Sequence, residues 1–135
     1  MNWGPVGWAM ALTAVATSLA DWLFMAVLFH DKYKAHPEVW RRPQGGAGEG
    51  KAIGLSALAS LLTPVAFVLL CAAWGLHTFE RTATLAAAVW LMGPVPALVG
   101  NYLFVKLHPL ILIAHLAGWL VKLLASALLV AWVLA

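Results

Sequence analysis

Residues 110–134 read LILIAHLAGWLVKLLASALLVAWVL, a run that is apolar almost throughout. About 18 or more consecutive apolar residues are enough for a helix to cross the hydrocarbon core of a membrane. Two ionisable side chains, His115 and Lys122, stand inside this run. Because a charge at bilayer depth is costly, such side chains usually face the protein interior. The run therefore predicts a membrane-spanning helix that carries a buried polar site.

Three further runs of this kind precede it, at residues 6–29, 52–74 and 82–104. The chain of 135 residues is 64% hydrophobic and only 10% charged, with a mean hydropathy of +0.91. These values lie far outside the range of soluble domains. We therefore predict an all-α integral membrane protein, with a single four-helix transmembrane domain over residues 1–135. The first run contains Asp21 and lacks a basic leading segment, so we interpret it as a retained helix and not as a secretory signal.

The basic residues predict how the helices cross the membrane. The first connection is the most basic and the third contains Lys106, whereas the second contains only Arg81. Because cytoplasmic connections are enriched in Lys and Arg, we place connections one and three in the cytoplasm and both termini outside the cell membrane. The net charge of +3 is explained by this topology, so the expected partner is the lipid bilayer and no nucleic acid is predicted. The basic residues of the first connection are Lys32, Lys34, Arg41, Arg42 and Lys51.

Polar side chains in different runs are expected to lie at similar depths. At ~1.5 Å per residue, Asp21 lies roughly 12 Å from the cytoplasmic end of its helix, and Lys122 roughly 18 Å from the corresponding end of the last helix. His115 lies roughly 8 Å deep on the same helix face as Lys122, whose long stem reaches toward either side. We expect Asp21 to contact one of these two basic side chains inside the bundle. We name the expected cluster the polar seam, comprising Asp21, His115, Lys122, Ser18, Ser60 and Thr63.

The two halves of the chain contain similar sequence segments. Asp21-Trp22-Leu23-Phe24 ends the first run much as Asn101-Tyr102-Leu103-Phe104 ends the third, and the second and fourth runs both close on a leucine-rich segment ending in Trp. Runs one and three cross the membrane in the same direction. A true duplication would therefore give two pseudo-symmetric helical hairpins related as parallel repeats. Asp21 and Asn101 would then be counterparts on a shared axis, with Trp22 and Tyr102 beside them.

Prolines interrupt two of the runs. Pro64 lies in the second, and Pro94 and Pro96 follow Gly93 in the third. A proline inside a helix removes a backbone donor and frees a carbonyl one turn earlier, so we predict a kink or break before each site. Broken membrane helices occur both at binding sites and for packing alone, and the sequence leaves both interpretations open.

The sequence predicts neither a metal nor a cofactor. No spacing of histidine and acidic residues matches a recognised metal-ligand motif, and neither a phosphate loop nor a dinucleotide fingerprint is present. Cys71 is the single cysteine, which excludes an internal disulfide. We interpret it as a small packing residue.

The chain resembles a family of small bacterial four-span membrane proteins called domain of unknown function seventeen-sixty-one. The resemblance rests on Asn101-Tyr102-Leu103-Phe104, followed by Pro109-Leu110 and the apolar run to Trp132, and on Asp21-Trp22 leading into the basic first connection. It implies the four-span architecture and a bacterial inner-membrane location, and it implies that His115 fills a polar position usual in the family. Asp21 departs from the family pattern, which often has a small residue there. The family brings no established activity.

Two classes of function and one structural alternative remain. The first is a non-enzymatic protein that binds, senses or moves a small ligand through the polar seam, and it predicts a water-accessible cavity around Asp21. A homodimer belongs to this interpretation, because four short helices alone enclose little volume. The second is a membrane enzyme acting on an isoprenoid or sterol-like lipophilic substrate, with Asp21 and His115 as acid and base; it predicts a closed apolar pocket beside them. The third, a structural partner subunit, predicts neither cavity. We favour the first. Its candidate ligand-binding residues are Asp21, Asn101, His115, Lys122, Ser18, Ser60, Thr63, Trp22 and Tyr102.

Overall fold

The computed structural model describes residues 2–33 and 45–135, and these residues form helices joined by short connections. Four stretches are long and apolar enough to cross a membrane, at Trp3–Leu28, Glu49–Ala73, Phe79–Phe104 and Pro109–Leu134. The predicted all-α fold with four long apolar helices is thus confirmed. In chain order the elements are α1 (Trp3–Trp22), the π-helix η1 (Leu23–Leu28), α2 (His30–Tyr33), α3 (Glu49–Ser60), α4 (Leu62–Ala73), α5 (Phe79–Met92), α6 (Pro94–Phe104) and α7 (Pro109–Leu134).

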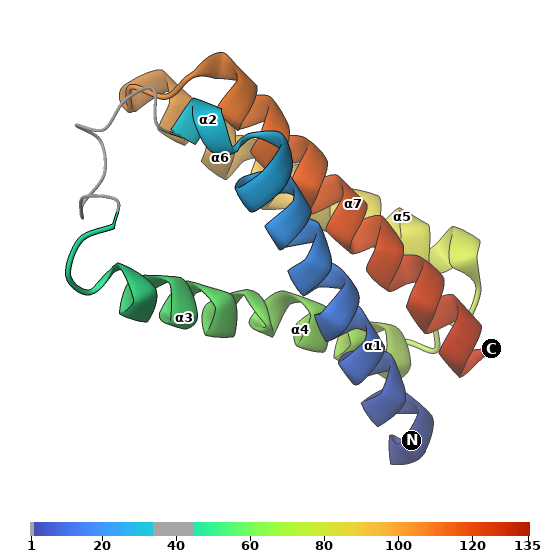
Figure 1. Ribbon diagram of the computed structural model, residues 1–135. Coiled ribbons are helices and arrows are strands. Elements are labelled where there is room, and N and C mark those ends of the chain that lie inside the picture. The colour runs from blue at the N-terminus through green and yellow to red at the C-terminus, as the bar shows by residue number, and fades with distance from the viewer. Residues whose placement is uncertain (1, 34–44) are drawn as a thin grey trace.

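Helix α7 is the centre of the bundle and packs against α1, α4, α5 and α6. Both chain ends lie at the same end of the molecule (Figure 1). The buried core lies toward that end, because its members come from the first half of α1, from α4 and α5, and from the second half of α7. The buried core residues are Val6, Ala9, Phe67, Val68, Cys71, Ala86, Leu123, Ala127 and Val130.

Two side-chain hydrogen bonds join α5 to α7. The buried Thr82 hydroxyl donates to the Ala127 carbonyl oxygen at 3.0 Å, and the Trp90 indole N–H donates to the Leu116 carbonyl oxygen at 2.9 Å. Between membrane helices such bonds contribute on the order of 1 kcal/mol each. They fix the register of α5 on α7, which apolar contacts alone leave less well determined.

The second and third spans break where their prolines predict. Helix α3 ends at Ser60, four residues before Pro64, and α5 ends at Met92, four residues before Pro96. The ring of a proline clashes with the carbonyl of the residue four positions earlier, and its nitrogen cannot donate to that carbonyl. At the end of α3, the Leu61 backbone N–H donates to the Leu58 carbonyl oxygen, three residues back, and not to the residue four positions back as in an α-helix. The predicted breaks are therefore confirmed.

The two halves of the second span have different surroundings. Helix α4 packs against α1 and α7, whereas the main neighbour of α3 is α4 and no residue of α3 is buried. Figure 1 shows α3 standing apart from α1 and α7. The bundle is therefore closed at the end that holds the chain termini and open between α1 and α3.

The last residues of the first span are π-helical. Over Leu23–Leu28 the helix widens, and the Phe29 N–H donates to the Phe24 carbonyl oxygen, five residues back, at 3.2 Å. Single π-helical turns within α-helices are frequent at functional sites. This one begins two residues after Asp21. The corresponding end of the third span, α6, is α-helical up to Phe104, so the two spans end differently, and the duplication itself stays a prediction.

Candidate functional site

An ion pair joins the first span to the last. The Lys122 ammonium on α7 donates to Asp21 Oδ1 on α1 at 2.6 Å. The Lys122 side chain is 11% exposed and the Asp21 side chain 30% exposed, so the carboxylate is the more accessible partner. Both residues lie inside segments apolar enough to span a membrane. The structure therefore brings together the two charges that the sequence places at bilayer depth.

Trp119 forms one wall of the ion pair. The Lys122 ammonium lies 4.3 Å from the centre of the Trp119 ring, a cation–π geometry. The two residues are three positions apart on α7, a spacing at which helix side chains meet. Sequence reasoning did not include Trp119 in the site, although this spacing was the signal that could have placed it there.

Close packing of α1 on α7 aligns the pair. Gly118 of α7 is buried, and a Cβ atom built on it would lie 3.4 Å from Phe24 Cγ. The Phe24 ring therefore lies over Gly118 with room for about a methyl group between it and α7, a close approach that small residues allow between membrane helices. Helices α1 and α7 run antiparallel (Figure 1). Asp21, one turn before Phe24, therefore faces Lys122, one turn after Gly118. No buried side-chain nitrogen or oxygen of the described residues lacks a hydrogen-bond partner.

His115 lies on the same face of α7, two turns from Lys122 toward the start of the helix. It is half-buried. The three ionisable residues of the polar seam therefore lie on two neighbouring helices, Asp21 on α1 and His115 with Lys122 on α7. Their roles toward a ligand stay predictions.

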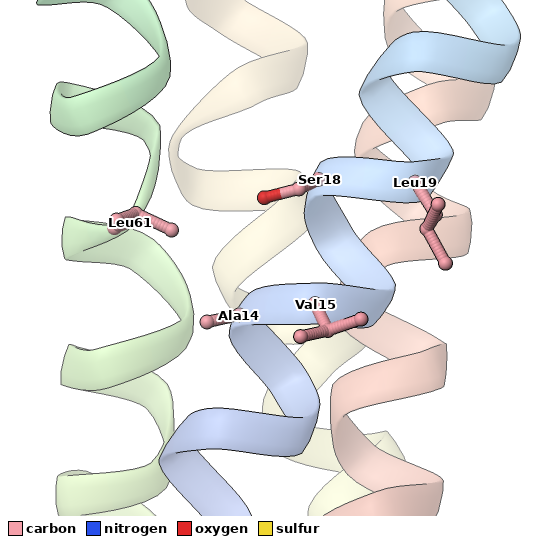
Figure 2. A pocket seen from close by; sticks show the side chains of 5 residues that line it. All are labelled: Ala14, Val15, Ser18, Leu19 and Leu61. Carbon is pink, nitrogen blue, oxygen red and sulfur yellow. The ribbon is translucent and has the colours of Figure 1, made fainter.

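A groove opens where α3 separates from α1. It has a volume of about 360 Å³ and is lined by four residues of α1 and by Leu61, the residue between α3 and α4. Figure 2 shows Ala14 and Ser18 directed toward Leu61 across the groove. The lining is apolar except for the Ser18 hydroxyl, and the groove is open on one side. Its lining residues are Ala14, Val15, Ser18, Leu19 and Leu61. We call it the α1–α3 groove.

The face of α1 that lines the α1–α3 groove also carries Asp21. Ala14, Ser18 and Asp21 follow i, i+4, i+7 spacing, so they share a face of α1. Asp21 stands one turn beyond Ser18, toward the end of the bundle at which α1 and α3 are separated. A ligand lying along this face of α1 would therefore meet apolar side chains, then a hydroxyl, then a carboxylate.

Comparison with known proteins assigns the chain to a family. A family model described as Protein of unknown function (DUF1761) matches residues 8–131. The chain belongs to this family. The resemblance seen in the sequence is thus confirmed, and the matched region includes both Asp21 and Lys122. No curated protein and no solved structure matches the chain.

Other predicted site residues of this DUF1761 protein lie elsewhere. Ser60 is on α3, and its hydroxyl donates to the Ala57 carbonyl oxygen of the same helix at 2.8 Å. Thr63 lines a second groove, of about 330 Å³, between α4, α5 and α7. On α6, Asn101 is exposed and Tyr102 is half-buried, and Trp22 is 60% exposed on α1. The structure thus joins Asp21 and Lys122, places His115 and Ser18 near them, and leaves Ser60 on the helix that stands apart.

Proposed function

We propose that this DUF1761 protein is a multi-pass membrane protein that binds a small lipophilic ligand in the α1–α3 groove, with the ligand's polar end at the Asp21–Lys122 pair. The observation that carries the proposal is the 30% exposure of a carboxylate inside a membrane-spanning helix, one turn beyond a groove. A charged side chain in a membrane span is a functional-site hypothesis by default. Binding is the step that sensing and moving a ligand share.

The shape of the groove supports entry from the side. Four of its five lining residues are apolar, and it is open where α3 leaves the bundle. A lipophilic ligand already dissolved in the bilayer reaches such a groove without crossing water. Its tail replaces lipid chains along α1, while its polar end finds hydrogen-bonding groups that acyl chains cannot offer.

The enzymatic alternative finds less support. It assigns Asp21 and His115 as acid and base beside a closed apolar pocket. Asp21 is instead paired with Lys122, and the two grooves among the described residues are open and not closed pockets. The structural-subunit alternative expects an ion pair that fixes α1 on α7 and a groove that only lipid occupies.

The proposal keeps the predicted topology in the cell membrane. Lys32, Lys51 and Lys106 lie near the span ends opposite the chain termini, which supports a cytoplasmic position for connections one and three. The Asp21–Lys122 pair then lies toward the cytoplasmic leaflet. A single copy lines the α1–α3 groove, so the binding proposal does not depend on the homodimer, which stays a prediction.

Filling the groove tests the proposal. Protein is purified from membranes in mild detergent, and small lipophilic molecules that co-purify with it are extracted and quantified by mass spectrometry. Ala14→Phe places a ring in the groove, and Ala87→Phe makes the same change at an exposed position of α5. We expect at least one component that is bound by the wild type and by Ala87→Phe and is depleted about tenfold by Ala14→Phe, a loss equivalent to about 1.4 kcal/mol.

Circular dichroism and size-exclusion chromatography establish that Ala14→Phe is folded, and Leu61→Trp provides a second way to fill the groove from its other wall. Identical bound components in the wild type and in the folded groove variants would contradict the proposal and favour a structural role.

A further inference from the structure

The ion pair is electrically balanced before any ligand arrives. One ammonium and one carboxylate lie 2.6 Å apart, and the lining of the α1–α3 groove contains no charged residue. A cationic or anionic head group bound beside the pair would therefore leave one uncompensated charge within the bilayer, which is unfavourable. A neutral polar head group avoids this cost.

The accessible partner of the pair is a hydrogen-bond acceptor. Lys122 is the more buried of the two, and within residues 2–33 and 45–135 the hydrogen bond to the Asp21 carboxylate is made at Oδ1. An ionised carboxylate only accepts hydrogen bonds, and it has capacity for several. A ligand that binds the exposed part of Asp21 must therefore donate a hydrogen. An ester or ketone head group does not satisfy this requirement, whereas a hydroxyl group does.

The Ser18 hydroxyl gives the head group a second partner. Ser18 lies one turn before Asp21 on the same face of α1, an axial rise of ~4.5 Å. A ligand hydroxyl between these residues can donate to the Asp21 carboxylate and accept from Ser18, because a hydroxyl serves as both donor and acceptor. The groove is shallow and largely open, with a volume of about 360 Å³. It suits one hydrocarbon chain better than the paired chains of a phospholipid.

We propose that the ligand is an uncharged, single-chain lipid alcohol, whose hydroxyl donates to Asp21 and whose tail lies in the α1–α3 groove. This inference rests on the proposed function and narrows it to one chemical class. It makes the Lys122 ammonium a positioning group, since Lys122 holds the Asp21 carboxylate and balances its charge without touching the ligand.

Three probes with one tail and different head groups test the inference. Oleyl alcohol is neutral, oleylamine is cationic and oleate is anionic at pH 8. Each is titrated into the full-length wild-type protein in detergent micelles, and bound probe is measured by native mass spectrometry. We expect oleyl alcohol to bind at least about tenfold more tightly than either charged probe.

Two charge variants should change the preference in opposite directions. Lys122→Met leaves the Asp21 charge unbalanced, so the preferred probe should become oleylamine. Asp21→Asn leaves the Lys122 charge unbalanced, so the preference should shift to oleate. Ala87→Phe, at an exposed position of α5, should keep the wild-type order. A ligand site whose head-group selectivity is unrelated to the ion pair would show no such reversal.

The outcomes separate the inference from the function on which it rests. Binding of oleylamine or oleate in preference to oleyl alcohol by the wild type, lost on Ala14→Phe, would overturn the lipid alcohol and leave the groove as a binding site. Equal binding of all three probes would also overturn it. Absence of binding of every probe to the wild type, together with unchanged co-purifying lipids in Ala14→Phe, would overturn both. The wild-type comparison alone decides the head group, even where a charge variant fails to fold.

Discussion

The Lys122 ammonium lies 2.6 Å from Asp21 Oδ1, although the two residues are 101 positions apart in the chain. This contact joins the last membrane span to the first and gives the bundle one neutral pair in place of two isolated charges. Trp119 stands against the ammonium at 4.3 Å, so the pair has an aromatic wall on the α7 side. The carboxylate side stays partly open. The same two residues therefore bear both on stability and on the proposed site.

Removing one member of the pair should destabilise the protein more than removing both. Asp21→Leu leaves the Lys122 ammonium, which is 11% exposed, without its counter-ion, and Lys122→Met leaves the carboxylate unpaired. We expect each single variant to lose about 2 kcal/mol, because an unpaired buried charge retains its desolvation cost. The double variant should lie closer to the wild type than either single variant. Unfolding in mixed micelles, followed by circular dichroism, measures the three differences. If the loss of stability in the double variant equals the sum of the two single losses, the two side chains are not energetically coupled.

The contact between Gly118 and Phe24 should tolerate one methyl group and no more. A Cβ atom on Gly118 would meet the Phe24 ring at 3.4 to 3.6 Å, which is ordinary van der Waals contact. Gly118→Ala should therefore change the free energy of unfolding by less than about 0.5 kcal/mol, since alanine also favours the helix. Gly118→Leu should cost about 1–3 kcal/mol by forcing α1 away from α7.

Gly100 supplies the matched control for this pair of substitutions. Nothing lies within 4 Å of a Cβ atom built on it, so Gly100→Leu should be tolerated. Thermal unfolding of the three variants in the same detergent makes the comparison. If Gly100→Leu and Gly118→Leu are equally destabilising, the loss at Gly118 does not come from disturbing the close packing of α1 on α7.

The hydrogen bond from Thr82 to Ala127 should be measurable against a neighbouring threonine. Thr82 is buried and its hydroxyl reaches α7 at 3.0 Å, whereas Thr84 is exposed and its hydroxyl donates to Glu80 of the same helix at 2.8 Å. Thr82→Val keeps the shape and removes the interhelical bond, so we expect a loss of about 1 kcal/mol. Thr84→Val should be within about 0.5 kcal/mol of the wild type. A loss at Thr84 as large as that at Thr82 would assign the effect to helix propensity and not to the bond.

The four spans could be predicted from sequence because hydropathy and length decide them. Proline chemistry likewise located both helix breaks, since the clash with the residue four positions earlier is local. The pairing of Asp21 with Lys122 followed from their similar depths and from the cost of leaving either charge in lipid. Each of these predictions depends on a strong effect that acts on few residues.

The separation of α3 from α1 could not be predicted in the same way. Lipid chains are as apolar as leucine, so the composition of a membrane helix does not reveal whether it faces protein or lipid. Ser60 was therefore expected in the polar seam, but it lies on α3 with its hydroxyl bonded to its own helix. The groove at Ala14 and Leu61 arises from this separation, and it was missed for the same reason. The π-helical turn at Leu23–Leu28 also has no signature in residue type that we can identify.

The orientation of the protein can be tested through single cysteines, because the natural one is inaccessible. Cys71 is fully buried, so it should give little background with a membrane-impermeant maleimide. Asn2 and Lys106 are exposed near opposite ends of the spans. With the termini outside, Asn2→Cys should be labelled on intact cells, and Lys106→Cys only after the membrane is permeabilised. Glu80→Cys in the first turn of α5, next to the second connection, should behave like Asn2→Cys, which controls for local effects at the N-terminus. Labelling of Lys106→Cys alone on intact cells would invert the topology and move the Asp21–Lys122 pair to the outer leaflet, where a lipid alcohol would have to be supplied from outside the cell.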